Sequence, residues 1–178
     1  KVALITGAGS VGPGWGNGRA MAVRFAAEGA RVFGADIDEN RMLETAERIA
    51  SDGGLFKGAA CDVTQSTSVA ALVQRCVDTF GRIDILVNNV GGSAKGGPVE
   101  MTEAVWDAQV DHNLKSVFLL CKHVLPHMVQ QGGGAIVNLS STSALRWTGA
   151  AQIAYAATKA GIIQFSKVLA VQYAAQGI

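Results

Sequence analysis

Short apolar runs, many of them β-branched, alternate along this chain with longer segments in which apolar residues recur at helical spacing. The apolar runs predict strands at residues 2–6, 31–36, 55–62, 83–88 and 135–140. The helical spacing predicts helices at residues 18–28, 39–51, 66–80, 102–130 and 152–175. The first helix is expected to bury one face, formed by Ala20, Val23, Ala26 and Ala27. In the fourth, Thr102 is a candidate N-cap and Pro126 predicts a kink or an early end. Because strand and helix alternate, we expect right-handed crossovers and a parallel sheet with helices on both faces.

The strand runs are continuously apolar, which is typical of strands buried on both faces of a sheet. The length of 178 residues suits one domain with a sizeable core. In such α/β folds, ligands bind beyond the carboxyl ends of the strands. Polar residues fall at these ends, namely Thr6, Asp36, Asp62, Asn88 and Ser140. We therefore expect one functional site along that edge of the sheet.

Composition excludes several classes of partner. Charged residues make up 16% of the chain and its formal net charge is +1, so nothing in its charge favours nucleic acid or an anionic membrane. This low content of charged residues indicates that part of the surface is buried in a homo-oligomer. No run approaches the ~18 apolar residues of a membrane span. The three cysteines lack metal or redox spacing, which predicts a cytoplasmic protein with reduced thiols and no metal site.

A glycine-rich loop follows the first predicted strand. Gly7-x-Gly9-x-x-Gly12 matches a dinucleotide-binding pattern literally, but that pattern needs a helix N-terminus aimed at phosphate. The segment Pro13-Gly14-Trp15-Gly16 is not the opening of a helix. We expect the helix to start at Asn17 or Gly18, with Asn17 as a candidate N-cap. The residues predicted to face the phosphates are therefore Gly7, Gly9, Gly16, Asn17 and Gly18.

Asp36 ends the second strand at about the distance from the glycines expected of a ribose-binding carboxylate. It would hydrogen-bond the ribose hydroxyls and repel a 2′-phosphate, which favours NAD over NADP. Arg41 lies five residues further on and would soften this preference. Ile37 follows Asp36 directly, and we expect it at the same site.

Tyr155 and Lys159 stand four residues apart, which places them on one face of a helix. A free tyrosine has a pKa of about 10, and a lysine cation held close favours the phenolate. Such a pair can act as a general acid and base. Because tyrosine and lysine also occur at this spacing by chance on surface helices, the catalytic interpretation depends on the motifs that precede the pair.

Taken in order, these motifs resemble the short-chain dehydrogenase/reductase family of the Tyr-x-x-x-Lys type. Thr6-Gly7 with Gly16-x-Gly18 resembles its phosphate loop. Asp62-Val63 is similar to its adenine-contacting pair. Asn88-Asn89-Val90-Gly91 resembles its Asn-Asn-Ala-Gly motif, with Val90 in place of alanine. The resemblance adds Asp62, Val63, Asn89 and Gly91 to the expected cofactor-binding residues, together with Tyr155 and Lys159.

The resemblance also implies a catalytic set of Asn113, Ser141, Tyr155 and Lys159. Tyr155 would be the acid/base on the substrate oxygen, and Lys159 would bind the nicotinamide ribose and favour ionisation of Tyr155. Ser141 would orient the substrate oxygen, and Asn113 would hold a water that relays protons. The implied activity is an NAD-dependent oxidoreductase that interconverts a small secondary alcohol and a ketone, as a tetramer or dimer.

The chain departs from the family pattern in three places. The phosphate loop is about five residues longer than a minimal one. Ser141 and Tyr155 are 14 positions apart, one more than is common, so Ser140 and Ser143 are alternatives to Ser141. The chain stops where relatives continue into further strands. We therefore expect residues 1–178 to be a single NAD(P)-binding Rossmann-like, doubly wound domain, C-terminally incomplete, with strand order 3-2-1-4-5.

Two other functions remain open. A non-catalytic NAD-binding module or fragment would bind NADH without turnover. Enoyl reductases of related fold have irregular phosphate loops too, but they space tyrosine and lysine more widely. The substrate pocket is expected between residues 91–97 and 143–153, with an apolar wall of Ala144, Leu145, Trp147 and Ile153.

Overall fold

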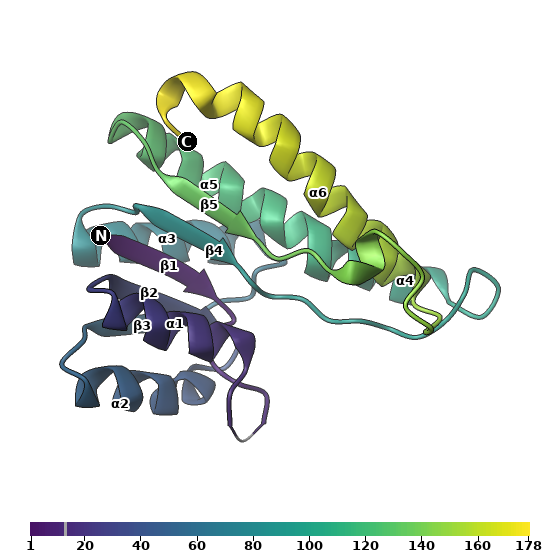
Figure 1. Cartoon of the computed structure of the whole chain (residues 1–178), viewed down its shortest axis with the longest axis horizontal. Coiled ribbons are helices and arrows are strands. Elements are labelled where there is room, and N and C mark those ends of the chain that lie inside the picture. Colours follow the sequence, from purple (N-terminus) through teal and green to yellow (C-terminus); the bar gives the residue numbers. More distant parts are fainter. Residues whose placement is uncertain (13) are drawn as a thin grey trace.

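The computed structural model describes residues 1–12 and 14–178; Pro13 of the glycine-rich loop lies outside them. Its strands form one parallel sheet in the order β3-β2-β1-β4-β5 (Figure 1), which confirms the predicted class and strand order. The strands are β1 (Val2–Thr6), β2 (Arg31–Asp36), β3 (Phe56–Ala60), β4 (Ile85–Asn88) and β5 (Ala135–Asn138).

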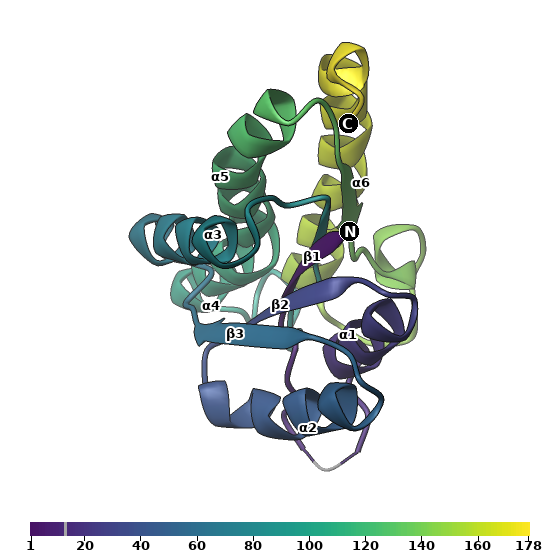
Figure 2. The same cartoon turned by 90° about the vertical axis from the view of Figure 1, so that its left-hand side faces the viewer.

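Helices cover both faces of this sheet, as Figure 2 shows from the side. The α-helices are α1 (Asn17–Ala27), α2 (Leu43–Ser51), α3 (Ser66–Phe80), α4 (Glu103–Val110), α5 (Ser116–Gln130) and α6 (Ile153–Tyr173). Helices α1 and α2 contribute to the apolar core on one face. Helices α3, α5 and α6 contribute to the larger core on the other.

Strand β1 shows why the sequences of the strands are continuously apolar. Successive side chains of a strand point to opposite faces. Val2 and Leu4 belong to the larger core, whereas Ala3 and Ile5 belong to the smaller one. All four are fully buried, so no position in the strand is left for a polar residue.

The prediction for α1 placed Ala20, Val23, Ala26 and Ala27 inward, and this was wrong in part. Ala20 and Ala27 are exposed, and the buried residues of the helix are Gly18, Arg19, Ala22 and Ala26. The rotation follows from the start of the helix, where Gly18 packs against the backbone of Gly7.

The helical segment predicted at residues 102–130 is three consecutive pieces. Thr102 caps α4 as predicted, since its Oγ1 accepts a hydrogen bond from the Val105 N–H at 3.3 Å. A π-turn at Asp111–Lys115 then joins α4 to α5. A kink or an early end was predicted at Pro126; the early end was wrong, because α5 continues to Gln130. Buried side chains on both sides of the proline hold that stretch against the core and offset its missing N–H.

The segment predicted as one helix at residues 39–51 begins instead with a 3₁₀ turn, Glu39–Met42, before α2. The Asp38 side chain accepts a hydrogen bond from the Asn40 N–H at 3.0 Å and starts this turn. No helix in the described part of the chain is long and apolar enough to cross a membrane.

Candidate active site

A cleft of about 340 Å³ opens at the carboxyl ends of β1, β2, β3 and β4. Every residue expected to bind the cofactor apart from Tyr155 and Lys159 lines it: Gly7, Gly9, Gly16, Asn17, Gly18, Asp36, Ile37, Asp62, Val63, Asn89 and Gly91. The lining also includes residues that were not predicted as site residues: Ser10, Val11, Arg41, Cys61, Val90 and His112. Sequence elements more than fifty residues apart therefore share one concave surface.

The glycine-rich loop is built around close backbone contact. A Cβ added to Gly18 would lie 1.7 Å from the carbonyl oxygen of Gly7, and one added to Gly9 would lie 2.6 Å from the Cβ of Arg41. A Cβ on Gly12 would meet nothing within 4 Å. The geometry thus favours the register with Gly7, Gly16 and Gly18 over the literal one that ends at Gly12.

Helix α1 opens onto this cleft without a side-chain cap. Its N-cap is Gly16, whose backbone is extended (φ −86°, ψ 157°), so the prediction of Asn17 as N-cap was wrong. Asn17 is the first helical residue instead. The first turn carries no acidic side chain, and its unpaired N–H groups can receive an anion. This end of the helix fits the pyrophosphate of a dinucleotide.

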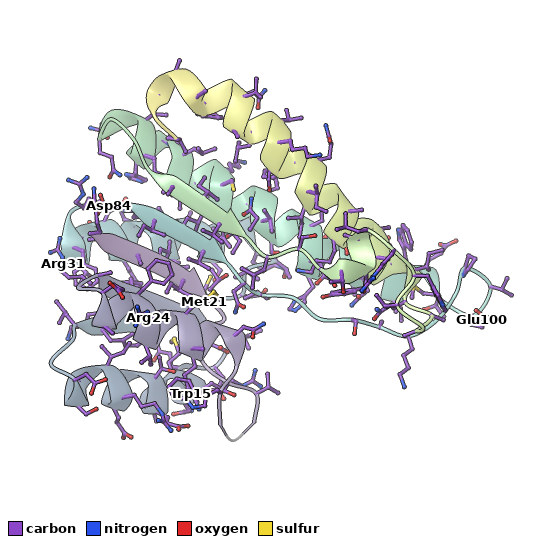
Figure 3. All side chains as sticks on the ribbon, viewed as in Figure 1. Trp15, Met21, Arg24, Arg31, Asp84 and Glu100 are labelled. Carbon is purple, nitrogen blue, oxygen red and sulfur yellow. The ribbon has the colours of Figure 1, made fainter. Side chains whose placement is uncertain are left out.

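Arg19 holds the long loop in place and was missed by the sequence analysis. Its side chain is buried, and its Nη1 donates to the Gly14 carbonyl and to Glu44 Oε2, each at 2.5 Å. The Arg48 guanidinium also bonds Glu44 and lies 4.7 Å from the ring centre of Trp15 (labelled in Figure 3). Together these contacts tie the loop to α2. The only sequence signal was an arginine within the first turn of a small-residue helix.

Both acidic strand ends accept hydrogen bonds from neighbouring residues. Asp36 Oδ2 accepts the Gly9 N–H at 3.2 Å and Oδ1 accepts the Asp38 N–H at 3.4 Å, and Arg41 Nη1 lies 3.8 Å from Oδ1. Each carboxylate oxygen has a second lone pair, so Asp36 can still accept a hydrogen bond from the cleft. Asp62 Oδ1 accepts both the N–H and the hydroxyl of Thr64, at 2.9 and 2.7 Å. These two hydrogen bonds hold the pKa of Asp62 below its usual range.

Asn89 joins the ends of β1 and β4. Its Nδ2 donates to the carbonyl oxygens of Thr6 at 3.0 Å and of Gly7 at 3.2 Å, and its backbone N–H donates to Thr6 Oγ1 at 3.1 Å. The side-chain amide therefore positions the glycine-rich loop, while the residue still lines the cleft.

Two of the four predicted catalytic residues, Asn113 and Lys159, lie against Gly91, and Tyr155 lies beside Lys159. Asn113 is buried within the π-turn, where its Oδ1 accepts the Gly92 N–H at 3.0 Å. A Cβ on Gly91 would lie 2.9 Å from both Asn113 Oδ1 and Lys159 Nζ. Lys159 Nζ lies 5.7 Å from the ring centre of Tyr155 and donates to the Leu139 carbonyl at 2.8 Å. Burial lowers the pKa of Lys159.

Ser141 lies at the start of the loop after β5. Its Oγ accepts the Ser143 N–H at 3.2 Å. Ser140 is already engaged, since its Oγ donates to the Lys159 carbonyl at 2.7 Å. Ser143 accepts from Gln152 Nε2 at 2.9 Å. The geometry therefore disfavours Ser140 for contact with a substrate and leaves Ser141 and Ser143, whose hydroxyl oxygens lie 3.3 Å apart.

His112 was not predicted as a site residue, yet it lines the cleft together with Asp62. Burial is the main cause that lowers the pKa of His112; the Asp62 carboxylate acts against this shift, and Lys159 adds to it. Its position directly before Asn113 was the available signal. No group of three His, Cys, Asp or Glu side chains suited to a metal occurs within residues 1–12 and 14–178.

A second cleft, of about 470 Å³, lies between the loop after β4 and the loop before α6. Two backbone hydrogen bonds clip these loops together, from the Gly96 N–H to Ala151 O at 2.9 Å and from the Ile153 N–H to Gly96 O at 3.3 Å. Trp147 and Ile153 line it as predicted. Ala144 and Leu145 do not line it, because Thr142–Ala144 forms a 3₁₀ turn and Leu145 is 77% exposed.

Comparison with known proteins agrees with this geometry. The whole chain, residues 1–178, matches the short chain dehydrogenase family. D-threitol dehydrogenase from Mycolicibacterium smegmatis is 39% identical over 100% of this chain and 66% of its own length. A crystal structure from Burkholderia xenovorans, assigned to the short-chain dehydrogenase/reductases, is 59% identical with a TM-score of 0.98, over 99% of this chain and 70% of that one. A polyketide ketoreductase of actinorhodin synthesis, crystallised with NADPH, is 35% identical with a TM-score of 0.93, over 100% of this chain and 68% of that one.

A parallel sheet with a glycine-rich turn, an open helix N-terminus and an acidic strand end defines a class of dinucleotide-binding α/β proteins. Within that class, the chain belongs to the short-chain dehydrogenase family, whose members named above are oxidoreductases. It spans about two thirds of the length of these relatives.

Proposed function

We propose that this protein is an NAD-dependent oxidoreductase that interconverts a secondary alcohol and a ketone. The observation that carries the proposal is that Asn113 and Lys159 lie against Gly91, a residue of the cleft suited to a dinucleotide, and that Lys159 Nζ lies 5.7 Å from the Tyr155 ring centre. The relatives named as a D-threitol dehydrogenase and as a ketoreductase support an alcohol and a ketone as the reacting groups.

The cleft fits the cofactor along its length. The N–H groups of α1 suit the pyrophosphate, the closely packed Gly7 and Gly18 admit it, and Asp36 suits the ribose hydroxyls. When bound, the nicotinamide would accept or donate the hydride. The chain's own residues would place the substrate and move the proton.

Tyr155 would exchange a proton with the substrate oxygen. Lys159, held by the Leu139 carbonyl next to the Tyr155 ring, would favour the phenolate through its positive charge. Ser141 would donate a hydrogen bond to the same substrate oxygen. Asn113, fixed by Gly92 on both sides of its amide, would hold the neighbouring backbone and a proton-relay water.

Replacement of Tyr155 by phenylalanine tests the proposal. We expect Tyr155→Phe to lower kcat by about 10²–10⁴-fold, the usual contribution of an acid/base group, with little change in NADH affinity. Tyr173→Phe is the matched control, because Tyr173 is the other tyrosine of the chain and packs against the core at the end of α6. The assay is NADH absorbance with a panel of secondary alcohols and ketones. Undiminished turnover in Tyr155→Phe would refute the mechanism, and NADH binding without turnover in the wild type would favour the non-catalytic module.

The preference for NAD depends on Asp36. We expect Asp36→Ser to raise kcat/KM with NADP relative to NAD by about tenfold or more, because the carboxylate no longer repels the 2′-phosphate and no longer pairs with Arg41. Asp52→Asn removes one negative charge from an exposed position directly after α2, outside the cleft lining, and should leave the ratio near that of the wild type. An unchanged ratio in Asp36→Ser would mean that this carboxylate does not select the cofactor.

We also propose a cytoplasmic homo-oligomer, either a tetramer or a dimer. Large apolar side chains are exposed on α5 and α6, namely Phe118 at 48%, Val168 at 46% and Val171 at 81%. Exposed apolar surface of this kind supports burial against another copy. Sedimentation analysis of the protein tests it, and a monomer at micromolar concentration would contradict it.

A further inference from the structure

The second cleft contains one charged side chain. Most of its lining is backbone, small residues and the apolar side chains of Trp147 and Ile153. Arg146 is the only acidic or basic residue among those that line it. An isolated charge in an otherwise apolar cleft is the kind of group that fixes the orientation of a ligand.

The Arg146 guanidinium has no partner within residues 1–12 and 14–178. The ion pairs and side-chain hydrogen bonds of that part of the chain do not include it, although its backbone N–H donates to the Thr142 carbonyl at 3.2 Å. A guanidinium remains charged at any working pH and presents donors that match a carboxylate in pairs. The donors of Arg146 are therefore available to a ligand.

A hydrogen bond links the cleft to Ser141, the serine proposed to bind the substrate oxygen. Ser141 Oγ lies 3.3 Å from Ser143 Oγ, which in turn accepts from Gln152 Nε2 at 2.9 Å. Ser143 and Gln152 both line the cleft, and Gln152 directly precedes α6, which carries Tyr155. A molecule whose oxygen lies at Ser141 would extend from there into the cleft.

The charges near this cleft do not cancel that of Arg146. Lys95 precedes the lining residue Gly96 and adds a second positive charge. The nearby carboxylate of Glu100 lies on the loop before α4 (labelled in Figure 3) and accepts the Gly97 N–H at 3.0 Å. No ion pair joins Glu100 to Arg146 in the described residues.

We propose that the substrate is an anionic ketone or secondary alcohol, such as a keto or hydroxy acid. Its carboxylate would pair with Arg146, and its carbon chain would lie against Trp147 and Ile153. This inference rests on the proposed function and narrows it. The cleft volume of about 470 Å³ is in the range of small-molecule sites.

The experiment compares keto acids with their methyl esters of equal chain length, at saturating NADH. We expect the kcat/KM of the wild type to be higher for the acid than for the ester by about tenfold or more, because only the acid can form the charge-assisted hydrogen bonds with Arg146. Arg146→Gln should reduce the acid-to-ester ratio to near one, and Arg146→Lys should retain part of it. The preference should also weaken as salt is added.

Arg75→Gln is the matched control, because Arg75 is an exposed arginine on α3, away from both clefts. It should keep the wild-type ratio. Equal use of acid and ester by the wild type, or an unchanged ratio in Arg146→Gln, would overturn the inference while leaving the proposed function intact. Absence of turnover with every acid and ester, in a protein that folds and binds NADH, would overturn the proposed function and this inference with it.

Discussion

Gly18→Ala is the most direct test of the glycine-rich loop. The added methyl would lie 1.7 Å from the Gly7 carbonyl oxygen and 2.7 Å from Asn89 Nδ2, both far inside van der Waals contact. The first partner is backbone and cannot rotate aside, so the loop must move by more than 1 Å. Overpacking of this kind costs about 3 kcal/mol, from which about 1 kcal/mol is recovered because alanine favours the helix.

The expected net loss is therefore about 2 kcal/mol in the free energy of unfolding, or a Tm lower by about 4–8 °C in a domain of this size. Cofactor affinity should fall further, since the movement displaces the N–H groups of α1. Thermal unfolding and NADH titration measure the two effects. Gly12→Ala is the control, because a Cβ there meets nothing within 4 Å and should change stability by less than about 0.5 kcal/mol.

The outcome distinguishes the two possible glycine registers. Loss of NADH binding in Gly12→Ala, with normal binding and stability in Gly18→Ala, would refute the reasoning and restore the literal Gly-x-Gly-x-x-Gly pattern. The same pair of variants therefore tests the structure of the loop and its proposed contact with phosphate.

Two further predictions concern titrating groups. Burial alone would raise the pKa of Asp84, but hydrogen bonds from the Val2 N–H at 2.7 Å and from Arg82 outweigh it and hold the pKa below its usual value. Because this pKa is lower in the folded state, the ionised carboxylate stabilises the fold above about pH 4, and the stabilisation is lost as the pH falls further. Asp84→Asn should therefore lower the free energy of unfolding by about 1–3 kcal/mol at pH 7 and by less at pH 3. A difference between variant and wild type that does not change with pH in urea unfolding would contradict this. Burial raises the pKa of Cys76 and of Cys121 to about 12, so neither thiol should react with a thiol reagent at pH 8 before unfolding, and rapid native-state labelling would contradict their burial.

The strands were predictable because burial on both faces leaves a signal within a few residues. β1, β2 and α3 have the predicted bounds, and the other strands lie within the predicted ranges. The inward face of α1 was less accessible to prediction. Alanine at four positions fits several rotations of a helix, and the one adopted depends on a contact between Gly18 and Gly7 that spacing does not encode.

In the candidate site, too, some residues could be predicted from the sequence and others could not. Residues with a fixed place relative to a strand end, such as Asp36 and Asp62, could be assigned from spacing. The burial of Arg19 could not, because its partners Gly14 and Glu44 come together only when α1 packs on α2. The π-turn likewise leaves no pattern, since five residues are too few to separate its period from that of an α-helix.

That π-turn makes the length of one segment critical. Each residue advances an α-helix by about 100°, so the extra residue taken up at Asp111–Lys115 sets α4 and α5 in different rotational phases. A single-residue deletion there would restore one uniform helix and turn one part against the other by about 100°. Either Asn113 would leave Gly92, or the apolar stripe of α5 would leave the sheet. Between Gln109 and Ser116, the fold should therefore tolerate substitutions far better than insertions or deletions.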